Sequence, residues 1–342
     1  MSTLDNSTLV RDFLEQSGIT KKLNTEGITE VAINRPFEIW TESSSGWICE
    51  EAAWLSYDLC WKLANTLSAF NNRSISVQSP IKTVELPDGE RGQIVIPPAC
   101  EAGTISMTFR KPSLKRFTLA DYIESGRFNN ANSISHKKTD LLPYQRELKN
   151  AHATRDYMSF FRLAVEHKLN IIIFGGTGSG KTTFAKAVVD VYPAGKRLIT
   201  IEELNELKLP YHLNHVHLLY GDTVTPKELV SSCMRMKPDH VFLAELTGDE
   251  AWDFMELLNT GHPGTITTAH ANGSLSGYAR VCGLIKQSAV GAGLDYEYIE
   301  RRVRTSFDAV LYMEHTEILE VAYDPEVKQA LLNGASLASI TL

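Results

Sequence analysis

The stretch GGTGSGKTT, residues 175–183, has the residue types and spacing needed to bind phosphate. It fits the pattern G-x-x-x-x-G-K-[ST]: the glycines let backbone N–H groups point at phosphate oxygens, and a following helix presents its positive end to the same anion. We therefore expect a nucleoside triphosphate at this loop. The residues expected to contact it are Gly176, Thr177, Gly178, Ser179, Gly180, Lys181, Thr182 and Thr183.

Two side chains at the end of this loop have the chemistry to act on a triphosphate. Lys181 is expected to reach the β- and γ-phosphates, and Thr182 to offer its hydroxyl to Mg²⁺. ATP and Mg²⁺ are therefore the expected cofactors. A phosphate loop shows only that a nucleotide binds, so the reaction depends on which other side chains reach the γ-phosphate.

Carboxylates follow two apolar segments farther along the chain. In HVFLAELTGDE, residues 240–250, Glu245 ends a strand-like run and is a candidate to orient an attacking water. In ITIEELNEL, residues 199–207, Glu202, Glu203 and Glu206 come after another such run, where open α/β sheets bind their ligands. We expect at least one of these three acids to approach Mg²⁺ through water.

Two histidines lie in TGHPGTITTAHANG, residues 260–273, among glycine, threonine and alanine. The side chains of this stretch are small and its backbone is flexible, which is unusual for a protein core, so we expect a loop. The residues alone leave the role of these two histidines open.

The elements around these residues predict two domains. Residues 1–124 contain a helical pattern over 52–70, two strands around the turn PDGERG and another strand over 104–112, which indicates a small α+β domain. Residues 125–143 are rich in Ser, Asn and charge and are expected to be a linker. From 144 to 342 helical and strand-like segments alternate, which favours an α/β domain with a mainly parallel sheet.

Composition restricts the function classes that remain. The chain has 342 residues, a formal net charge of −7 and no dense Lys/Arg tract, so direct nucleic-acid binding has no support. Its five cysteines are scattered without a Cys-x-x-Cys pair, which argues against a disulfide framework or a structural zinc site and favours a reducing cytosolic compartment. The first residues are polar, and no apolar run is long enough to span a bilayer, so any membrane contact is expected to be peripheral.

The segments GGTGSGKTT, ITIEE, MKPDHVFLAELTGDEAWD and TGHPGTITTAHAN, in this order and spacing, resemble the motifs of the secretion-superfamily traffic ATPases. After the phosphate loop they correspond to the acidic box, the Walker B region and the histidine box of that superfamily. The wording GHPGT-x-TT-x-HAN is most similar to the ATPase of type IV secretion systems, the machines of conjugation and effector export. The resemblance extends from about residue 80 to residue 315. In this chain Ala244, Thr247 and Glu203 stand where Gly, Arg and Asp are usual.

This resemblance implies a homo-hexameric ring of two-domain subunits, with nucleotide held between the N-terminal domain and a RecA-like C-terminal domain. It also implies contacts with inner-membrane channel components and other secretion ATPases, in the cytoplasm at the bacterial inner membrane. By the same resemblance His262 shapes the histidine loop. The remaining implied roles are an acidic box of Glu202 and Glu206, hydrolysis promoted by Glu245, γ-phosphate sensing by His270, and phosphate contacts from Arg91 and Arg110 of the N-terminal domain.

Three alternatives stay open. A pilus-retraction or type II secretion ATPase belongs to the same superfamily, although the tetracysteine zinc segment of type II motors is missing. A small-molecule kinase would need an acceptor-binding lid, for which the histidine box gives no reason. A recombinase or helicase is disfavoured by the acidic charge balance.

Overall fold

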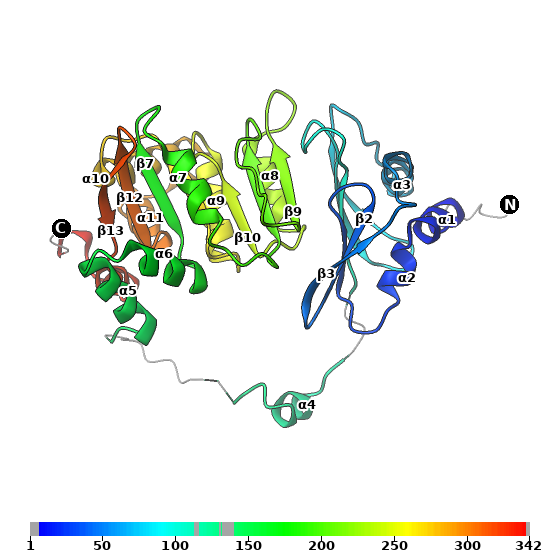
Figure 1. The fold of residues 1–342 in the computed structure, drawn as a ribbon, viewed down its shortest axis with the longest axis horizontal. Coiled ribbons are helices and arrows are strands. Elements are labelled where there is room, and N and C mark those ends of the chain that lie inside the picture. Colours follow the sequence, from blue (N-terminus) through cyan, green and yellow to red (C-terminus); the bar gives the residue numbers. More distant parts are fainter. Residues whose placement is uncertain (1–6, 113–115, 130, 132–139, 340–342) are drawn as a thin grey trace.

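The chain forms two sheets, each with its own helices, and the two lie side by side in Figure 1. The computed structural model describes residues 7–112, 116–129, 131 and 140–339. No helix among these residues combines the length and the apolar character that crossing a membrane requires. All five cysteines are free thiols.

The N-terminal domain is an antiparallel sheet in the order β3-β2-β1-β6-β5-β4, with three helices packed on one face. The helix predicted over 52–70 begins later, at Tyr57, because Ser56 is extended and its side chain accepts the N–H of Leu59 as a helix cap. The helices are α1 (Ser7–Ser17), α2 (Ile19–Leu23) and α3 (Tyr57–Phe70), and the strands are β1 (Glu30–Ile33), β2 (Glu38–Ser43), β3 (Gly46–Glu51), β4 (Ile81–Glu85), β5 (Arg91–Val95) and β6 (Ser106–Arg110).

The C-terminal domain is a seven-stranded sheet in the order β13-β12-β7-β11-β10-β8-β9, parallel except for β13. Helices cover both faces over two apolar clusters, so the predicted α/β class with a mainly parallel sheet is confirmed. The strands are β7 (Ile171–Gly175), β8 (Leu198–Glu202), β9 (His215–Leu219), β10 (His240–Leu243), β11 (Ile266–Ala269), β12 (Ala309–Glu314) and β13 (Glu317–Ala322). The helices are α5 (Pro143–Ala153), α6 (Tyr157–Glu166), α7 (Lys181–Val189), α8 (Pro226–Cys233), α9 (Glu250–Asn259), α10 (Ser274–Gln287), α11 (Tyr296–Ser306) and α12 (Pro325–Leu332), with 3₁₀ turns at η1 (Gly291–Gly293) and η2 (Leu337–Ser339).

The loop expected over 260–273 is in part a central strand. β11 pairs with β7 on one side and β10 on the other, and its residues are buried. Threonine has a branched side chain that fits a pleated, covered surface, so a small polar run can serve as a core strand. His262 precedes this strand and His270 follows it, which puts the two histidines at opposite ends of β11.

The N-terminal sheet packs against the β9 edge of the C-terminal sheet (Figure 1). The backbone N–H of Leu219 donates to the carbonyl of Ala99 at 2.9 Å, as part of an isolated antiparallel bridge between the two domains. Arg197 is fully buried at this junction and donates to the side-chain oxygens of Asn34 at 2.7 Å and Asn214 at 2.6 Å. A buried guanidinium bound by acceptors from both domains holds them together in this arrangement.

Between the two domains in sequence lies α4 (Leu119–Glu124), which Figure 1 shows below both sheets. This helix begins with a capping box, in which Thr118 accepts the N–H of Asp121 and the Asp121 carboxylate accepts the N–H of Thr118. Of the linker predicted over 125–143, residues 130 and 132–139 lie outside the described residues. Its boundaries, and the domain limits at 124 and 144, therefore stay predictions.

Candidate active site

The phosphate-binding loop lies between the carboxyl end of β7 and the first turn of α7. Gly178 and Gly180 have φ values of 72° and 90°, the left-handed region that glycine enters without strain. A Cβ on Gly175 would lie 2.5 Å from the carbonyl oxygen of Met313, so only glycine allows this close approach. The loop encloses a recess of about 340 Å³ lined by Gly178, Ser179, Gly180, Lys181, Thr182, Thr183 and Thr316.

The side chain of Lys181 hydrogen-bonds to the backbone of its own phosphate loop. Its ammonium donates to the carbonyls of Gly175 at 3.0 Å and Gly176 at 2.8 Å. Burial lowers the pKa of this amine, while the carboxylate of Glu245 acts in the opposite direction. In the same loop, the hydroxyl of Ser179 is buried without a hydrogen-bond partner among the described residues. The loop therefore offers an ammonium and a hydroxyl that an anion can engage.

Glu245 and His270 meet beside this loop. The Nε2 of His270 lies 3.0 Å from Oε1 of Glu245, and both side chains are partly exposed, at 43% and 31%. Glu245 follows β10 and His270 follows β11, two strands that are neighbours in the sheet. Because parallel strands end at the same edge, residues 25 positions apart in sequence are brought into contact at the edge where β7 delivers the phosphate loop.

Two residues that sequence reasoning missed hold this pair in place. The hydroxyl of Thr268 donates to the carbonyl of Ala244 at 2.8 Å, which ties β11 to the residue before Glu245. The buried carboxylate of Glu250 accepts the N–H groups of Thr247 at 2.7 Å and Gly248 at 2.9 Å. The three-residue spacing from Thr247 to Glu250 is the usual signal of such a helix-start arrangement and could have indicated it.

The two carboxylates predicted for the acidic box have different surroundings. Glu202 is buried at the end of β8, and its Oε2 accepts the N–H groups of Leu207 at 2.8 Å and Glu206 at 3.1 Å. Burial raises the pKa of this carboxyl group. Glu206 is exposed. In this structure Glu202 therefore fixes the backbone of the acidic loop, and Glu206 is the carboxylate of the two that solvent can reach.

Arg91 and Arg110 lie side by side in the N-terminal sheet, as register partners in β5 and β6. Arg110 is exposed, and its Nε lies 3.5 Å from Oε1 of the buried Glu30. In the next strand pair Glu42 is the register partner of Glu30, and Oε2 of Glu42 lies 3.6 Å from Nζ of Lys237. Lys237 comes shortly before β10 begins, so this end of the N-terminal sheet is near the amino ends of the parallel strands.

The structure does not bring these arginines to the phosphate loop of their own chain. That loop follows the carboxyl end of β7, and three strands separate β7 from the β9 edge on which the N-terminal sheet packs. Four strand spacings amount to roughly 19 Å, well beyond the reach of an arginine side chain. In this arrangement Arg91 and Arg110 therefore do not contact the phosphate loop of their own chain, and their contact with nucleotide stays a prediction.

Comparison with known proteins agrees with this fold and identifies the family. Residues 138–311 match the family described as type II/IV secretion system protein. The chain belongs to this family. It is 41% identical over 324 residues to the type IV secretion system protein VirB11 of Brucella suis, an alignment that covers 90% of this chain and 89% of the relative. It is 35% identical to the PtlH homologue of Bordetella bronchiseptica, with 85% and 87% covered.

A solved structure shows the same fold. The crystal structure of the VirB11 ATPase from the Brucella suis type IV secretion system, in complex with sulphate, superposes with a TM-score of 0.89 at 42% identity. The match covers 94% of this chain and 99% of that one. This chain is therefore an ATPase of the type IV secretion type, as its motifs predicted. The type II and pilus-retraction alternatives are not favoured, since these relatives are type IV secretion proteins.

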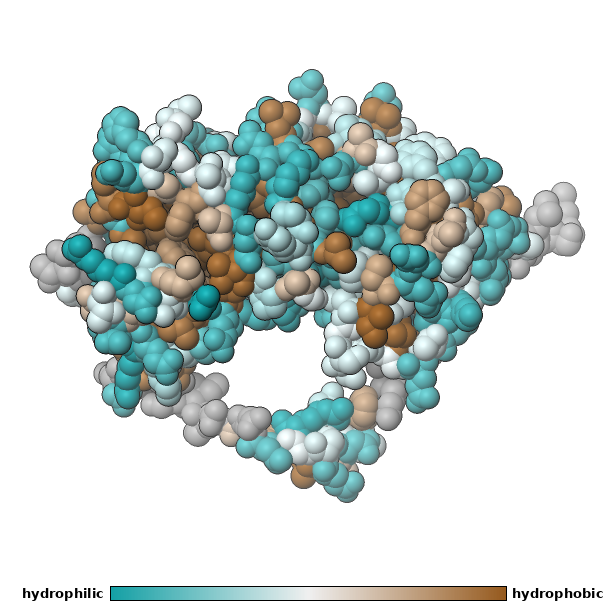
Figure 2. Space-filling model, in the orientation of Figure 1, coloured by the Kyte–Doolittle hydropathy of each residue, from teal (hydrophilic) through white to brown (hydrophobic). Residues whose placement is uncertain are grey.

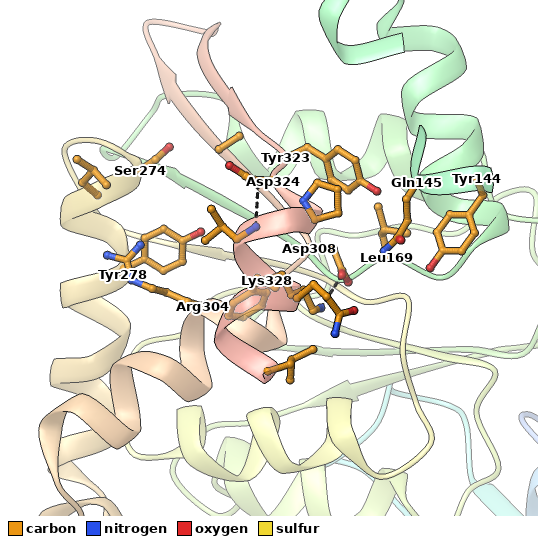
Figure 3. Close-up of a pocket in the computed structure, with 17 residues that line it drawn as sticks. Tyr144, Gln145, Leu169, Ser274, Tyr278, Arg304, Asp308, Tyr323, Asp324 and Lys328 are labelled. Carbon is orange, nitrogen blue, oxygen red and sulfur yellow. Dashed lines mark hydrogen bonds and ion pairs between the residues drawn. The ribbon is translucent and has the colours of Figure 1, made fainter. Parts of the chain in front are cut away.

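This secretion ATPase has a larger recess, of about 420 Å³, away from the phosphate loop (Figure 3). Its two lining cations have partners within the recess: Lys328 pairs with Asp308, and the guanidinium of Arg304 lies 4.4 Å from the centre of the Tyr278 ring. Asp324 accepts the N–H of Val327 at the start of α12. These contacts indicate that the recess results from the packing of α12 against its neighbours. None of the residues that line the recess belongs to the phosphate loop.

The histidines of HLNHVH, residues 212–217, are also engaged in packing. His212 bonds the carbonyl of Tyr192 at 2.9 Å, and Nδ1 of His217 lies 2.8 Å from the hydroxyl of Thr200. Burial lowers the pKa of His217 to about 3, so it is neutral at physiological pH. Across the described residues, no group of three or more His, Cys, Asp or Glu side chains is arranged to hold a metal ion.

Proposed function

We propose that this ATPase is a hexameric motor that hydrolyses Mg-ATP to energise substrate export and pilus biogenesis by a type IV secretion system. The observation that carries the proposal is the contact between Glu245 and His270 beside a phosphate-binding loop. A kinase site would present an acceptor pocket at this edge, whereas a carboxylate and an imidazole are suited to water and to phosphate.

The phosphate loop fits a nucleoside triphosphate. The loop N–H groups and the start of α7 suit the phosphates, and the ammonium of Lys181 can exchange its bonds to loop carbonyls for bonds to phosphate oxygens. Mg²⁺ would neutralise charge on the phosphates. Among the described residues, the group suited to it is the hydroxyl of Thr182, with Glu206 reaching it through water; Glu202 would act by holding the acidic loop.

In the proposed reaction Glu245 accepts a hydrogen bond from the attacking water, and His270 donates one to the γ-phosphate. While His270 bonds Glu245, the two side chains hold each other at the edge of the loop. A γ-phosphate would compete for Nε2 of His270, and its loss on hydrolysis would return that nitrogen to Glu245. The pair therefore reports the state of the nucleotide.

The ring accounts for two further features. An open apolar groove of about 320 Å³ runs between α6, α7 and β13, with Met158 and Leu319 exposed at 62% and 52%, and Figure 2 shows hydrophobic residues gathered on that face. Exposed apolar surface of this kind is typical of a contact between subunits. Arg91 and Arg110 are far from their own phosphate loop, so in the proposed ring they contact the nucleotide of a neighbouring subunit.

We propose that this ATPase works at the cytoplasmic face of the bacterial inner membrane, in contact with channel components and other secretion ATPases.

Native mass measurement with and without Mg-ATP tests the oligomeric state and the ligand together. We expect a hexamer that binds ATP and hydrolyses it without any acceptor substrate. A monomer in all conditions would contradict the ring, and turnover that requires an added acceptor would indicate a kinase instead.

A further inference from the structure

The turn between β12 and β13 is conformationally unusual. Glu314 and Glu317 are register partners, so only His315 and Thr316 form the turn. Both have positive φ, 47° and 68°, as the two central residues of a type I′ hairpin require. Asn-Gly is the usual pair at these positions, and a β-branched threonine there costs backbone energy. Such strain persists where the surroundings hold it and is frequent at ligand sites.

This turn packs directly on the phosphate loop. Thr316 lines the same recess as residues 178–183 of the loop. A Cβ placed on Gly180 would lie 3.5 Å from the Cα of Thr316, and one on Gly175 would meet the backbone of Met313. The hairpin is therefore a wall of the nucleotide recess. The side chain of His315 at its tip is 90% exposed, with Nδ1 3.9 Å from Oε1 of Glu314.

The order of strands indicates how a nucleotide bound at the loop would be oriented. β11 and β10 lie on one side of β7, and β12 and β13 lie on the other. Glu245 and His270, which come from the first side, are the groups proposed for the γ-phosphate. A triphosphate with its γ end toward them has its α-phosphate and nucleoside on the opposite side of the loop. That side is the one occupied by the β12–β13 hairpin.

We infer that the hairpin tip is a nucleoside-binding wall, in which the imidazole of His315 stacks on the base while Thr316 holds the turn against the phosphate loop. The inference rests on the proposed function, because it requires phosphates in the loop. A flat aromatic ring is suited to this contact, since every base offers a π face and stacking tolerates different bases. The turn conformation fixes the backbone from which the ring projects.

Ligands with and without a base separate this role from a structural one. His315→Ala should bind ADP and a non-hydrolysable ATP analogue about tenfold more weakly, the scale of one lost base–aromatic contact, and bind inorganic tripolyphosphate as the unchanged protein does. His315→Phe keeps a stacking ring and should restore nucleotide affinity. Equal weakening of tripolyphosphate and nucleotide would overturn the inference, because it would show that the hairpin only supports the loop.

Two further outcomes are informative. Unchanged nucleotide affinity in His315→Ala, with fewer hexamers by native mass measurement, would overturn the inference and assign the tip to a subunit contact. Failure of the proposed function looks different. In that case the unchanged protein itself binds neither tripolyphosphate nor nucleotide, and Lys181→Ala makes no difference to either ligand.

Discussion

The Nε2 of His270 lies 3.0 Å from Oε1 of Glu245, although the two residues are on different strands and 25 positions apart. They meet because β10 and β11 are parallel neighbours whose carboxyl ends reach the same edge. The phosphate loop starts at that edge, after β7. The phosphate loop accounts for nucleotide binding, whereas the Glu245–His270 pair is proposed to act in hydrolysis. Substitutions at each of these residues test the two roles separately.

Substitutions of Lys181 and of Glu245 should impair different steps, nucleotide binding and hydrolysis respectively. Lys181→Ala should lose both nucleotide affinity and hydrolysis, because the ammonium is proposed to bind the β- and γ-phosphates. Glu245→Gln should still bind ATP but turn over about two to four powers of ten more slowly, the usual effect of losing a general base. Equilibrium binding of a fluorescent nucleotide, compared with phosphate release, distinguishes them. If both variants lose binding equally, Glu245 has no role in chemistry.

His270→Ala should change which nucleotide the protein prefers. Its affinity for ADP should remain, because the imidazole is proposed to contact only the γ-phosphate. Discrimination between ADP and a non-hydrolysable ATP analogue should fall by roughly tenfold, the effect of one charge-assisted hydrogen bond. Paired titrations with the two ligands measure this ratio. A ratio unchanged from that of the parent chain would reduce His270 to a structural role.

Thr268 is predicted to position Glu245 without touching substrate. Thr268→Val removes the hydroxyl that donates to Ala244 and should lower kcat by about tenfold with little change in KM, since the carboxylate loses its fixed position. Thr267→Val is a matched control, because the Thr267 hydroxyl is also buried but has no hydrogen-bond partner among the described residues. Equal effects of the two substitutions on kcat would argue against positioning.

The two arginines test whether subunits share sites. The double variant Arg91→Ala, Arg110→Ala should form an intact ring whose hydrolysis is reduced roughly tenfold or more, as expected for lost guanidinium–phosphate bonds. Mixing it with Lys181→Ala subunits should restore part of the activity, because one subunit then supplies the arginines and its neighbour the phosphate loop. Mixed rings no more active than the average of the two parents would exclude a shared site.

Glu30 gives a pH dependence to stability. Burial raises the pKa of this carboxyl group from 4.5 to about 7, with Arg110 acting against the shift. The folded protein therefore holds the proton more tightly than the unfolded chain between these values, and stability falls as pH rises from 4.5 to 7. The cost at pH 8 is on the order of 3 kcal/mol.

Glu30→Gln removes this titration. Relative to the parent chain, the variant should be nearly neutral at pH 4.5 and more stable at pH 8, as measured by urea unfolding at the two values. Asp88→Asn, at an exposed carboxylate whose pKa is lowered from 3.8 by its hydrogen bond with Arg11, serves as a contrast, because its contribution to stability is lost only at lower pH and the effect of the substitution should be nearly the same at pH 4.5 and pH 8. A stability difference for Glu30→Gln that is the same at both pH values would show that the carboxylate is not buried as described.

The amino-acid sequence alone determined the phosphate loop, the α/β class of the C-terminal domain and the family. These are local properties: the spacing of Gly180, Lys181 and Thr182, and the alternation of apolar segments with helical ones, are written within short windows of the chain. The strand-end positions of Glu245 and Glu202 could likewise be predicted, because each acid directly follows an apolar run.

Tertiary structure alone decided what depends on pairing between distant segments. The run around Thr267 and Thr268 is a buried strand only because β7 and β10 flank it, whereas its composition indicated a loop. Arg91 and Arg110 are remote from their own phosphate loop because Ala99 and Leu219 join the N-terminal sheet to the β9 edge. The order of strands in a sheet depends on contacts between residues far apart in sequence, and the free energy of burying whole sheet faces selects it. No short window of sequence therefore specifies this order.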